Sequence, residues 1–237
     1  MTLAMIDRAV QALCLEVAAL DAEQTNWHVL AEEELLHEAA ICIFGSQTHF
    51  EIALAAANRA RSSGLFRPTA LRAKSSRYEA RVVSVLSKPL RVHIGGRRRT
   101  TLPRFRNRLA SLLCATIERI YGHGLSFKSI LSKSLSARDA RESLVEAVSG
   151  FGPKQASLYL RRVGFSADLA ILDTHILDYL KMARGVEPKP GSLSKLSTYE
   201  QIEREFRQVA REFGHAIGCV DMAMWVTMRV AKREALL

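Results

Sequence analysis

The sequence has no long apolar run and only four scattered cysteines, and each shortage excludes a class of protein. No stretch of 18 apolar residues occurs, so we expect no transmembrane helix. The N-terminal residues MTLAMIDRAVQ lack a basic segment and a cleavage site of small residues, which argues against a signal peptide. The cysteines form no C-x-x-C pair and no zinc-binding spacing, so we expect reduced, mostly buried thiols in a cytosolic protein. They are Cys14, Cys42, Cys114 and Cys219.

Acidic residues are nearly absent from one part of the chain. The 237 residues contain 34 Lys and Arg against 24 Asp and Glu, which gives a formal net charge of +10. From Arg59 to Arg108, 15 Lys and Arg accompany a single acid, Glu79, so this basic window carries +14. Residues 1–58 carry −8 and residues 109–237 carry +4. The local excess indicates a polyanionic partner, most simply nucleic acid, although a solvated face would have the same composition.

Helical periodicity runs through most of the chain, and a hydrophobic content of 48% is typical of a globular protein. We predict an all-α fold of ten or eleven helices, because no alternation of strands and helices is visible. Residues 64–102 are ambiguous: SRYEARVVSVLSKPL fits a helix or a strand, and VHIGGRRRTT is typical of a surface turn or loop. The predicted helices cover residues 4–20, 28–45, 46–61, 103–121, 126–133, 136–148, 153–164, 174–182, 198–213 and 219–234.

Residues 138–164 read RDARESLVEAVSGFGPKQASLYLRRVG, which predicts two helices joined by Gly150-Phe151-Gly152. The glycines let the backbone turn tightly and approach another backbone closely. Phe151, which lies between the two glycines, can point into the core. The start of the second helix presents amide N–H groups that bind an anion such as a DNA phosphate, although Pro153 removes one donor. This is a helix–hairpin–helix arrangement, which holds DNA without reading its sequence.

Two residues near this turn carry candidate chemistry. Lys154 lies in the first turn of the second helix, where the helix dipole disfavours a protonated amine. A neutral amine is a nucleophile, but Lys154 could equally contact a phosphate. Nineteen residues further on, AILDTHILDYL places Asp173 at the start of another helix. There it can cap the helix, or face a sugar on which positive charge develops as a base departs.

The segments GFGPKQAS, LRRVG and AILDTHIL resemble the helix–hairpin–helix DNA glycosylases. Within that superfamily they are most similar to the compact 8-oxoguanine DNA glycosylase/AP lyases first recognised in archaea. The resemblance is strong over residues 140–180. It implies an all-α, two-lobed fold with a cleft between the lobes. It also implies that Lys154 is the Schiff-base nucleophile, that Asp173 is its partner, and that neither a cofactor nor a metal is needed. Cys219 alone cannot hold the four-cysteine iron–sulfur cluster of some relatives.

Three further candidate residues depend on this resemblance. Gln47, in the pair Gln47-Thr48, fits a position from which a Gln side chain enters the space left by a flipped base. An ordinary joint between two helices is the alternative. Asp221 and Trp225 lie four apart on one helix face and fit a base pocket, in which Trp stacks on a purine and Asp accepts from its N–H edge. A core Trp and an Asp at a helix start are the alternative.

The remaining candidates are DNA contacts. His175 follows Asp173 by two residues and is a candidate phosphate contact. Gly150 and Gly152 are expected to let the backbone approach DNA. The arginine run at residues 97–99 is expected to hold phosphates and to make binding salt-dependent. That run is Arg97, Arg98 and Arg99.

We expect residues 1–63 and 168–237 to form one lobe together, and residues 64–167 to form the central lobe with the basic insertion. The predicted activity is excision of 8-oxoguanine through a lysine Schiff base and β-elimination. The predicted partner is double-stranded DNA with a damaged base, bound by a monomer in the cytoplasm, at the nucleoid, away from membranes. Two alternatives stay open. One is a glycosylase for another modified base, possibly in foreign DNA; the other is a non-catalytic DNA-binding module.

Overall fold

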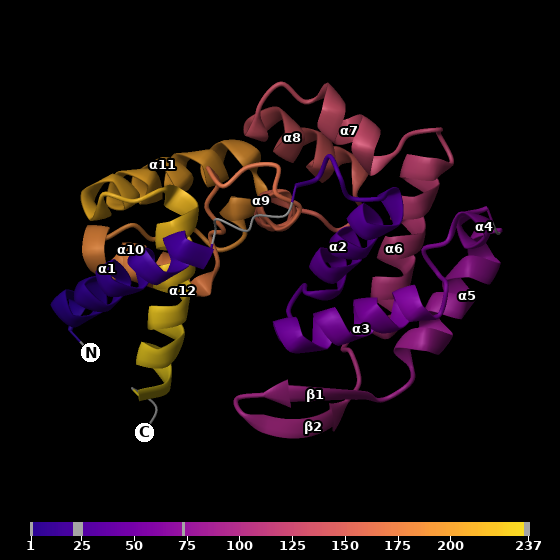
Figure 1. Cartoon of the computed structure of the whole chain (residues 1–237), viewed down its shortest axis with the longest axis horizontal. Coiled ribbons are helices and arrows are strands. Elements are labelled where there is room, and N and C mark those ends of the chain that lie inside the picture. Colours follow the sequence, from indigo (N-terminus) through magenta and orange to yellow (C-terminus); the bar gives the residue numbers. More distant parts are fainter. Residues whose placement is uncertain (1, 21–25, 73, 235–237) are drawn as a thin grey trace. The chain divides into compact units, whose positions relative to one another are not determined.

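The computed structural model describes residues 2–20, 26–72 and 74–234. Within these residues it contains twelve α-helices, one 3-10 helix and one two-stranded sheet (Figure 1), so the predicted all-α class is confirmed. The chain divides into two compact units. Unit 1 is Met1–Asn26 with Gly152–Leu237, and unit 2 is Trp27–Phe151. No helix in the described residues is both long and apolar enough to cross a bilayer.

Unit 1 joins the two ends of the chain. Helix α1 packs along α12, and α10 and α11 also pack against α12. The apolar faces of these helices meet in one core, which includes the buried side chains of Val10, Leu180, Phe206 and Val220. Its elements are α1 (Leu3–Leu20), α9 (Pro153–Arg162), α10 (Thr174–Arg184), η2 (Ser192–Ser194), α11 (Leu196–Phe213) and α12 (Ile217–Glu234).

Unit 2 is built around α2, which packs against α3, α6 and α7. A single half-buried carboxylate ties three of these helices together: Glu32 accepts from the Tyr121 hydroxyl at 2.8 Å and from the Phe127 and Lys128 backbone N–H groups at 2.7 and 3.1 Å. The elements are α2 (Glu32–Phe44), α3 (Phe50–Ser62), α4 (Pro68–Leu71), α5 (Ser75–Leu86), β1 (Leu90–Ile94), β2 (Arg97–Thr101), α6 (Arg106–Tyr121), α7 (Phe127–Lys133) and α8 (Ala137–Ala147).

The boundaries of the units differ from those of the expected lobes. Residues 27–63 fall in unit 2 rather than with the C-terminal helices, because α2 and α3 pack against α6, α7 and β1. Residues 152–167 fall in unit 1, so the unit boundary lies inside the Gly150–Gly152 turn. The contacts that decide this are between segments far apart in sequence, and periodicity carries no information about them.

The expectation of a surface turn or loop for residues 92–101 is wrong for the strands on either side of Gly95 and Gly96. Residues 90–101 form an antiparallel β-hairpin beside α3 (Figure 1). Leu90 and Val92 alternate with exposed residues and are buried, so one face of β1 has an apolar surface to pack. Gly95 and Gly96 have φ of 60° and 76°, which suits the two-residue turns that join twisted strands. The following helix, α6, begins at Arg106 rather than at Pro103.

Candidate active site

The first turn of α9 places Lys154 directly after the glycine turn. Gly152 is the N-cap residue in an extended conformation, and Pro153 occupies the first helical position. Pro153 has no N–H, and the Ala156 N–H already donates to the Gly152 carbonyl at 3.1 Å. The backbone N–H groups of Gly152, Lys154 and Gln155 are therefore the remaining donors at this helix end. The Lys154 side chain is half-buried.

Asp173 caps α10 with one carboxylate oxygen. Its Oδ1 accepts from the backbone N–H groups of His175 and Ile176 at 2.8 and 3.1 Å. Among the described residues, no donor contacts the other oxygen, Oδ2, and the side chain is only half-buried. The carboxylate is thus oriented by the helix while one oxygen is left to face a ligand. The capping role and the charge-stabilising role that the sequence left open are compatible.

The backbone that leads to Asp173 is held by three successive hydrogen bonds to buried side chains. Ala170 N–H donates to Glu203 Oε1 at 3.0 Å, Ile171 N–H to Asp221 Oδ1 at 2.9 Å, and Leu172 N–H to the Tyr199 hydroxyl at 3.0 Å. The Tyr199 hydroxyl in turn donates to the Ala170 carbonyl at 2.8 Å. The segment forms no sheet, so these side chains satisfy the buried N–H groups that a neighbouring strand would otherwise satisfy.

The same side chains connect this segment to the helix of Lys154. Tyr199 also interacts with Ser157 of α9, whose hydroxyl donates to the Pro153 carbonyl at 2.9 Å. Burial raises the pKa of Tyr199 well above its usual value, so the hydroxyl stays protonated and can donate. The first turn of α9 and the segment before Asp173 therefore share one buried anchor. We call residues 170–172 with Tyr199, Glu203 and Asp221 the backbone clamp.

Arg161, two turns after Lys154, supplies a second connection. Its guanidinium donates to Asp221 Oδ2 and, at 2.9 Å, to the Gly218 carbonyl of α12. Burial raises the pKa of Asp221 to about 6, although Arg161 and the Ile171 N–H act in the opposite direction. Both oxygens of Asp221 thus accept from the protein, and the residue is 3% exposed. Base recognition by Asp221 stays a prediction that competes with these bonds.

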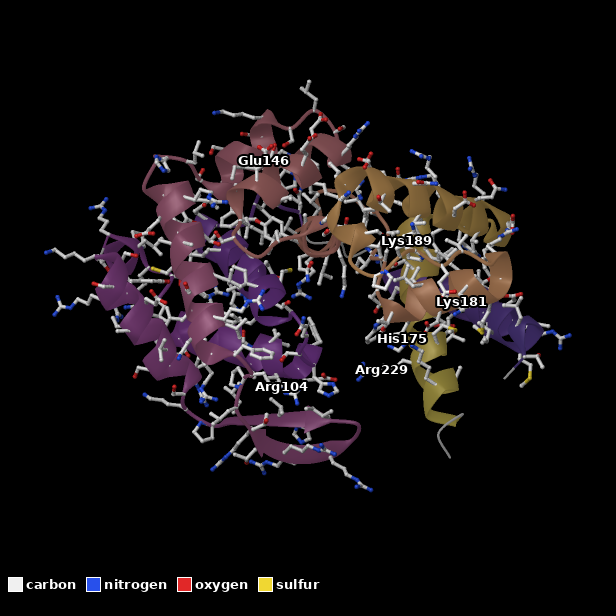
Figure 2. All side chains as sticks on the ribbon, turned by 180° about the vertical axis from the view of Figure 1, so that it is seen from behind. Arg104, Glu146, His175, Lys181, Lys189 and Arg229 are labelled. Carbon is white, nitrogen blue, oxygen red and sulfur yellow. The ribbon has the colours of Figure 1, made fainter. Side chains whose placement is uncertain are left out.

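Trp225, the other predicted pocket residue, lies between two side chains with positive or potentially positive charge. The Arg229 guanidinium lies 4.9 Å from the centre of its ring, and the His175 ring meets it edge-on at 6.3 Å. Figure 2 shows His175 and Arg229 near one another on unit 1. Burial lowers the pKa of His175 despite the nearby Asp173. Its Nδ1 is buried and, among the described residues, has no hydrogen-bond partner.

The remaining predicted residues lie in unit 2, except for Gly152, which belongs to unit 1. Gln47 is exposed in the turn between α2 and α3 and has φ of 56°, a conformation that is uncommon for a residue other than glycine and that clusters at functional sites. Gly150 has φ of 87°, whereas Gly152 is extended. Phe151 between them is 7% exposed, as its predicted core position requires. The predicted contacts Arg97, Arg98 and Arg99 are exposed on β2.

Sequence reasoning missed the backbone clamp. One indication was present: Tyr199 and Glu203 fall on the apolar stripe of α11 with Ile202 and Phe206, and a carboxylate on such a stripe requires a buried donor. The donors are backbone groups of a segment without regular structure, which no side-chain pattern reveals. Among the described residues, no group of three or more His, Cys, Asp and Glu could hold a metal ion.

Residues 96–215, just over half of the chain, match the family model described as 8-oxoguanine DNA glycosylase. An 8-oxoguanine DNA glycosylase/AP lyase from Korarchaeum cryptofilum is 39% identical over 98 residues, which are 41% of this chain and 46% of that protein. The chain therefore matches about half the length of this relative.

Two solved structures have the same fold. The 8-oxoguanine DNA glycosylase of Methanocaldococcus jannaschii has a TM-score of 0.68 at 21% identity, covering 93% of this chain and 92% of that chain. A structure of the same organism's enzyme in complex with a 15mer DNA containing 8-oxoguanine has a TM-score of 0.63 at 23% identity, covering 93% and 87%. The predicted helix–hairpin–helix glycosylase fold is confirmed. With the family match over residues 96–215, this shows that the chain belongs to the 8-oxoguanine DNA glycosylase family.

Proposed function

We propose that the protein is a DNA glycosylase/AP lyase that excises 8-oxoguanine from double-stranded DNA. The observation that carries the proposal is the arrangement of Lys154 and Asp173. Each begins a helix of unit 1, and the backbone clamp ties the start of α9 to the segment that ends at Asp173. The names of the relatives support the substrate. Membership of a glycosylase family argues against a module that only binds DNA.

In the proposed reaction, the damaged nucleotide leaves the duplex stack and its sugar lies against Lys154. The lone pair of Lys154 Nζ attacks C1′, the bond from C1′ to the base breaks, and the base leaves with the bonding electrons and takes up a proton. Asp173 stabilises the positive charge that develops on the sugar through its uncapped oxygen. A proton passes from the amine to O4′ as the C1′–O4′ bond breaks and the sugar ring opens, which leaves a Schiff base between Nζ and C1′. Loss of a C2′ proton then breaks the C3′–O bond and nicks the strand.

The other predicted residues have supporting roles in this proposal. Trp225 stacks on the extruded purine, with Asp221 beside it, and His175 contacts a phosphate. Gln47 fills the space that the base vacates. The phosphate backbone is held by Gly150, Gly152 and the arginine run at residues 97–99. The protein is proposed to act as a monomer on the DNA of the nucleoid.

Covalent trapping tests the proposal. The protein is incubated with duplexes that contain 8-oxoguanine, uracil or thymine glycol, and borohydride is added to reduce any Schiff base. We expect a trapped complex with 8-oxoguanine alone. Trapping with another lesion only would assign the enzyme to that base. Base release is assayed in parallel, because a glycosylase without lyase activity escapes trapping.

Two lysine variants control the assignment. Lys154→Gln is expected to abolish trapping while it keeps DNA binding. Lys133→Gln removes an equally charged, exposed lysine at the end of α7 and is expected to trap like the wild type. Trapping that survives in Lys154→Gln would show that another amine is the nucleophile. Salt-sensitive binding without trapping or base release on any lesion would leave only a DNA-binding module.

A further inference from the structure

The register of the β-hairpin sorts its residues onto two faces. Directly paired residues of antiparallel strands point to the same side, and the pairs are Arg91 with Thr100 and His93 with Arg98 on one side. All four residues of this outward face are exposed. The opposite side carries the pairs Leu90 with Thr101, Val92 with Arg99 and Ile94 with Arg97. Only this second side has buried residues.

The hairpin is fixed to unit 2 through its second side. β1 packs against α3, and Leu90 and Val92 are 3% and 5% exposed. The guanidinium of Arg59, on α3, donates to the Lys88 and Pro89 carbonyls at 2.6 and 2.8 Å, just before the first strand. The backbone of the outward face is therefore held in place by unit 2, so the backbone loses little conformational entropy when its cations meet a ligand.

The outward face has no acidic counterpart. No carboxylate of the described residues pairs with the guanidinium of Arg91 or Arg98. His93 lies directly opposite Arg98, and Arg91 lies two residues along the strand, about 7 Å away at the usual rise of a strand. The Thr100 hydroxyl and a ring N–H of His93 add further hydrogen-bond donors. This combination of clustered cations and hydrogen-bond donors complements phosphate oxygens.

We propose that the outward face of the hairpin, formed by Arg91, His93, Arg98 and Thr100, binds the phosphate backbone of duplex DNA. This proposal rests on the proposed function, because it takes DNA as the substrate. It adds a DNA-binding surface in unit 2 to the candidate active site in unit 1. The three arginines at residues 97–99 are not equivalent in this proposal. Arg98 belongs to the outward face, whereas Arg97 and Arg99 belong to the face that packs on α3. A bilayer surface fits less well, since the outward face has no apolar side chain to insert.

The salt dependence of binding tests this surface without relying on catalysis. The dissociation constant for an undamaged 25-base-pair duplex is measured from 50 to 400 mM salt for Arg91→Ala/Arg98→Ala. Each lost phosphate contact lowers the log–log slope by about 0.9, so we expect a decrease of about 1.8. Arg77→Ala/Arg81→Ala, which removes two exposed arginines of α5 from the same basic window, is the matched control and should change the slope much less.

Each outcome is decisive for the hairpin. Equal decreases in the two double variants would show a diffuse cationic field and overturn the proposal. So would an unchanged slope in Arg91→Ala/Arg98→Ala when its thermal unfolding matches the wild type. If Arg91→Ala/Arg98→Ala binds DNA like the wild type but no longer co-sediments with phosphatidylglycerol vesicles, the face binds a membrane instead. Borohydride trapping of the wild-type protein on damaged duplex is scored separately from these slopes, so failure of the hairpin and failure of the proposed enzyme are distinguishable.

Discussion

The guanidinium of Arg161 and the carboxylate of Asp221 form a buried ion pair that joins α9 to α12. The side chains are 13% and 5% exposed, so water screens the pair poorly. Asp221 uses its second oxygen to hold the Ile171 N–H, two residues before Asp173. The pair thus connects the helix of the proposed nucleophile to the segment of the proposed carboxylate partner.

Arg161→Met is expected to destabilise the protein by about 3 kcal/mol at pH 7.5, because it leaves the Asp221 carboxylate buried without its cation. Burial already raises the pKa of Asp221 to about 6, and loss of Arg161 raises it further. A carboxyl whose folded pKa is raised binds more protons when folded, so stability falls as pH rises from about 4 through the folded pKa. The deficit should therefore be smaller at pH 5. Urea unfolding at both pH values measures it.

The double variant Arg161→Met/Asp221→Leu separates charge from packing. Because it removes both charges, it is expected to recover most of the stability at pH 7.5 and to lose the extra pH dependence. A double variant as unstable as Arg161→Met would show that the lost bond to the Gly218 carbonyl, rather than the unpaired carboxylate, carries the effect.

Tyr199→Phe tests the backbone clamp. It leaves the Leu172 N–H and the Ala170 carbonyl without their partner, which costs about 1–3 kcal/mol. If the clamp positions Asp173, the single-turnover rate of base release on saturating DNA should also fall, on the order of 10-fold, with little change in the dissociation constant. The pattern to look for is a change in rate rather than in binding.

Tyr78→Phe is the matched control for the clamp. Its hydroxyl is equally buried and donates to the Leu65 carbonyl at 3.1 Å, but it lies in unit 2. We expect a comparable loss of stability with an unchanged single-turnover rate. Equal rate losses in the two variants would mean that the rate reports general destabilisation, and the clamp would have no positioning role.

Asp173→Asn and Asp173→Ala separate the two roles of this side chain. Asn caps a helix about as well as Asp, so the first variant should keep its stability, whereas Ala should lose about 1 kcal/mol. Both variants remove the carboxylate charge and should lower the single-turnover rate about 100-fold or more. An Asn variant with wild-type rate would reduce Asp173 to a helix cap. Thermal unfolding and base release, measured on the same samples, give the comparison.

The parts of this fold that the sequence predicted are those set by local pattern. Asp173 caps α10, as its position before a helical run indicates, and α8 begins at Ala137, one residue from the predicted start. The β-hairpin was missed because its strands have only two buried apolar residues, on β1, and their partner surface on α3 lies about 30 residues earlier. The backbone clamp was missed for the same reason: its donors and acceptors meet only after α11 and α12 have packed.

The two glycines of the turn can also be told apart by substitution. Gly150 has φ of 87°, and an added Cβ would lie 2.9 Å from Leu112 Cδ1, so Gly150→Ala is expected to cost about 1–2 kcal/mol. At Gly152 the nearest atom to an added Cβ is Gln155 Oε1 at 3.8 Å, and Gly152→Ala should leave stability nearly unchanged.

For DNA affinity we expect the opposite order, with a larger effect for Gly152→Ala than for Gly150→Ala. If Gly152 lets the start of α9 approach a phosphate, the methyl group of Gly152→Ala intrudes on that contact and weakens binding to undamaged duplex at fixed salt. Gly150→Ala, measured well below its unfolding temperature, should weaken binding less. If Gly152→Ala binds DNA like the wild type, the backbone at residue 152 does not approach the phosphate, and the absence of a side chain there serves neither the fold nor DNA binding.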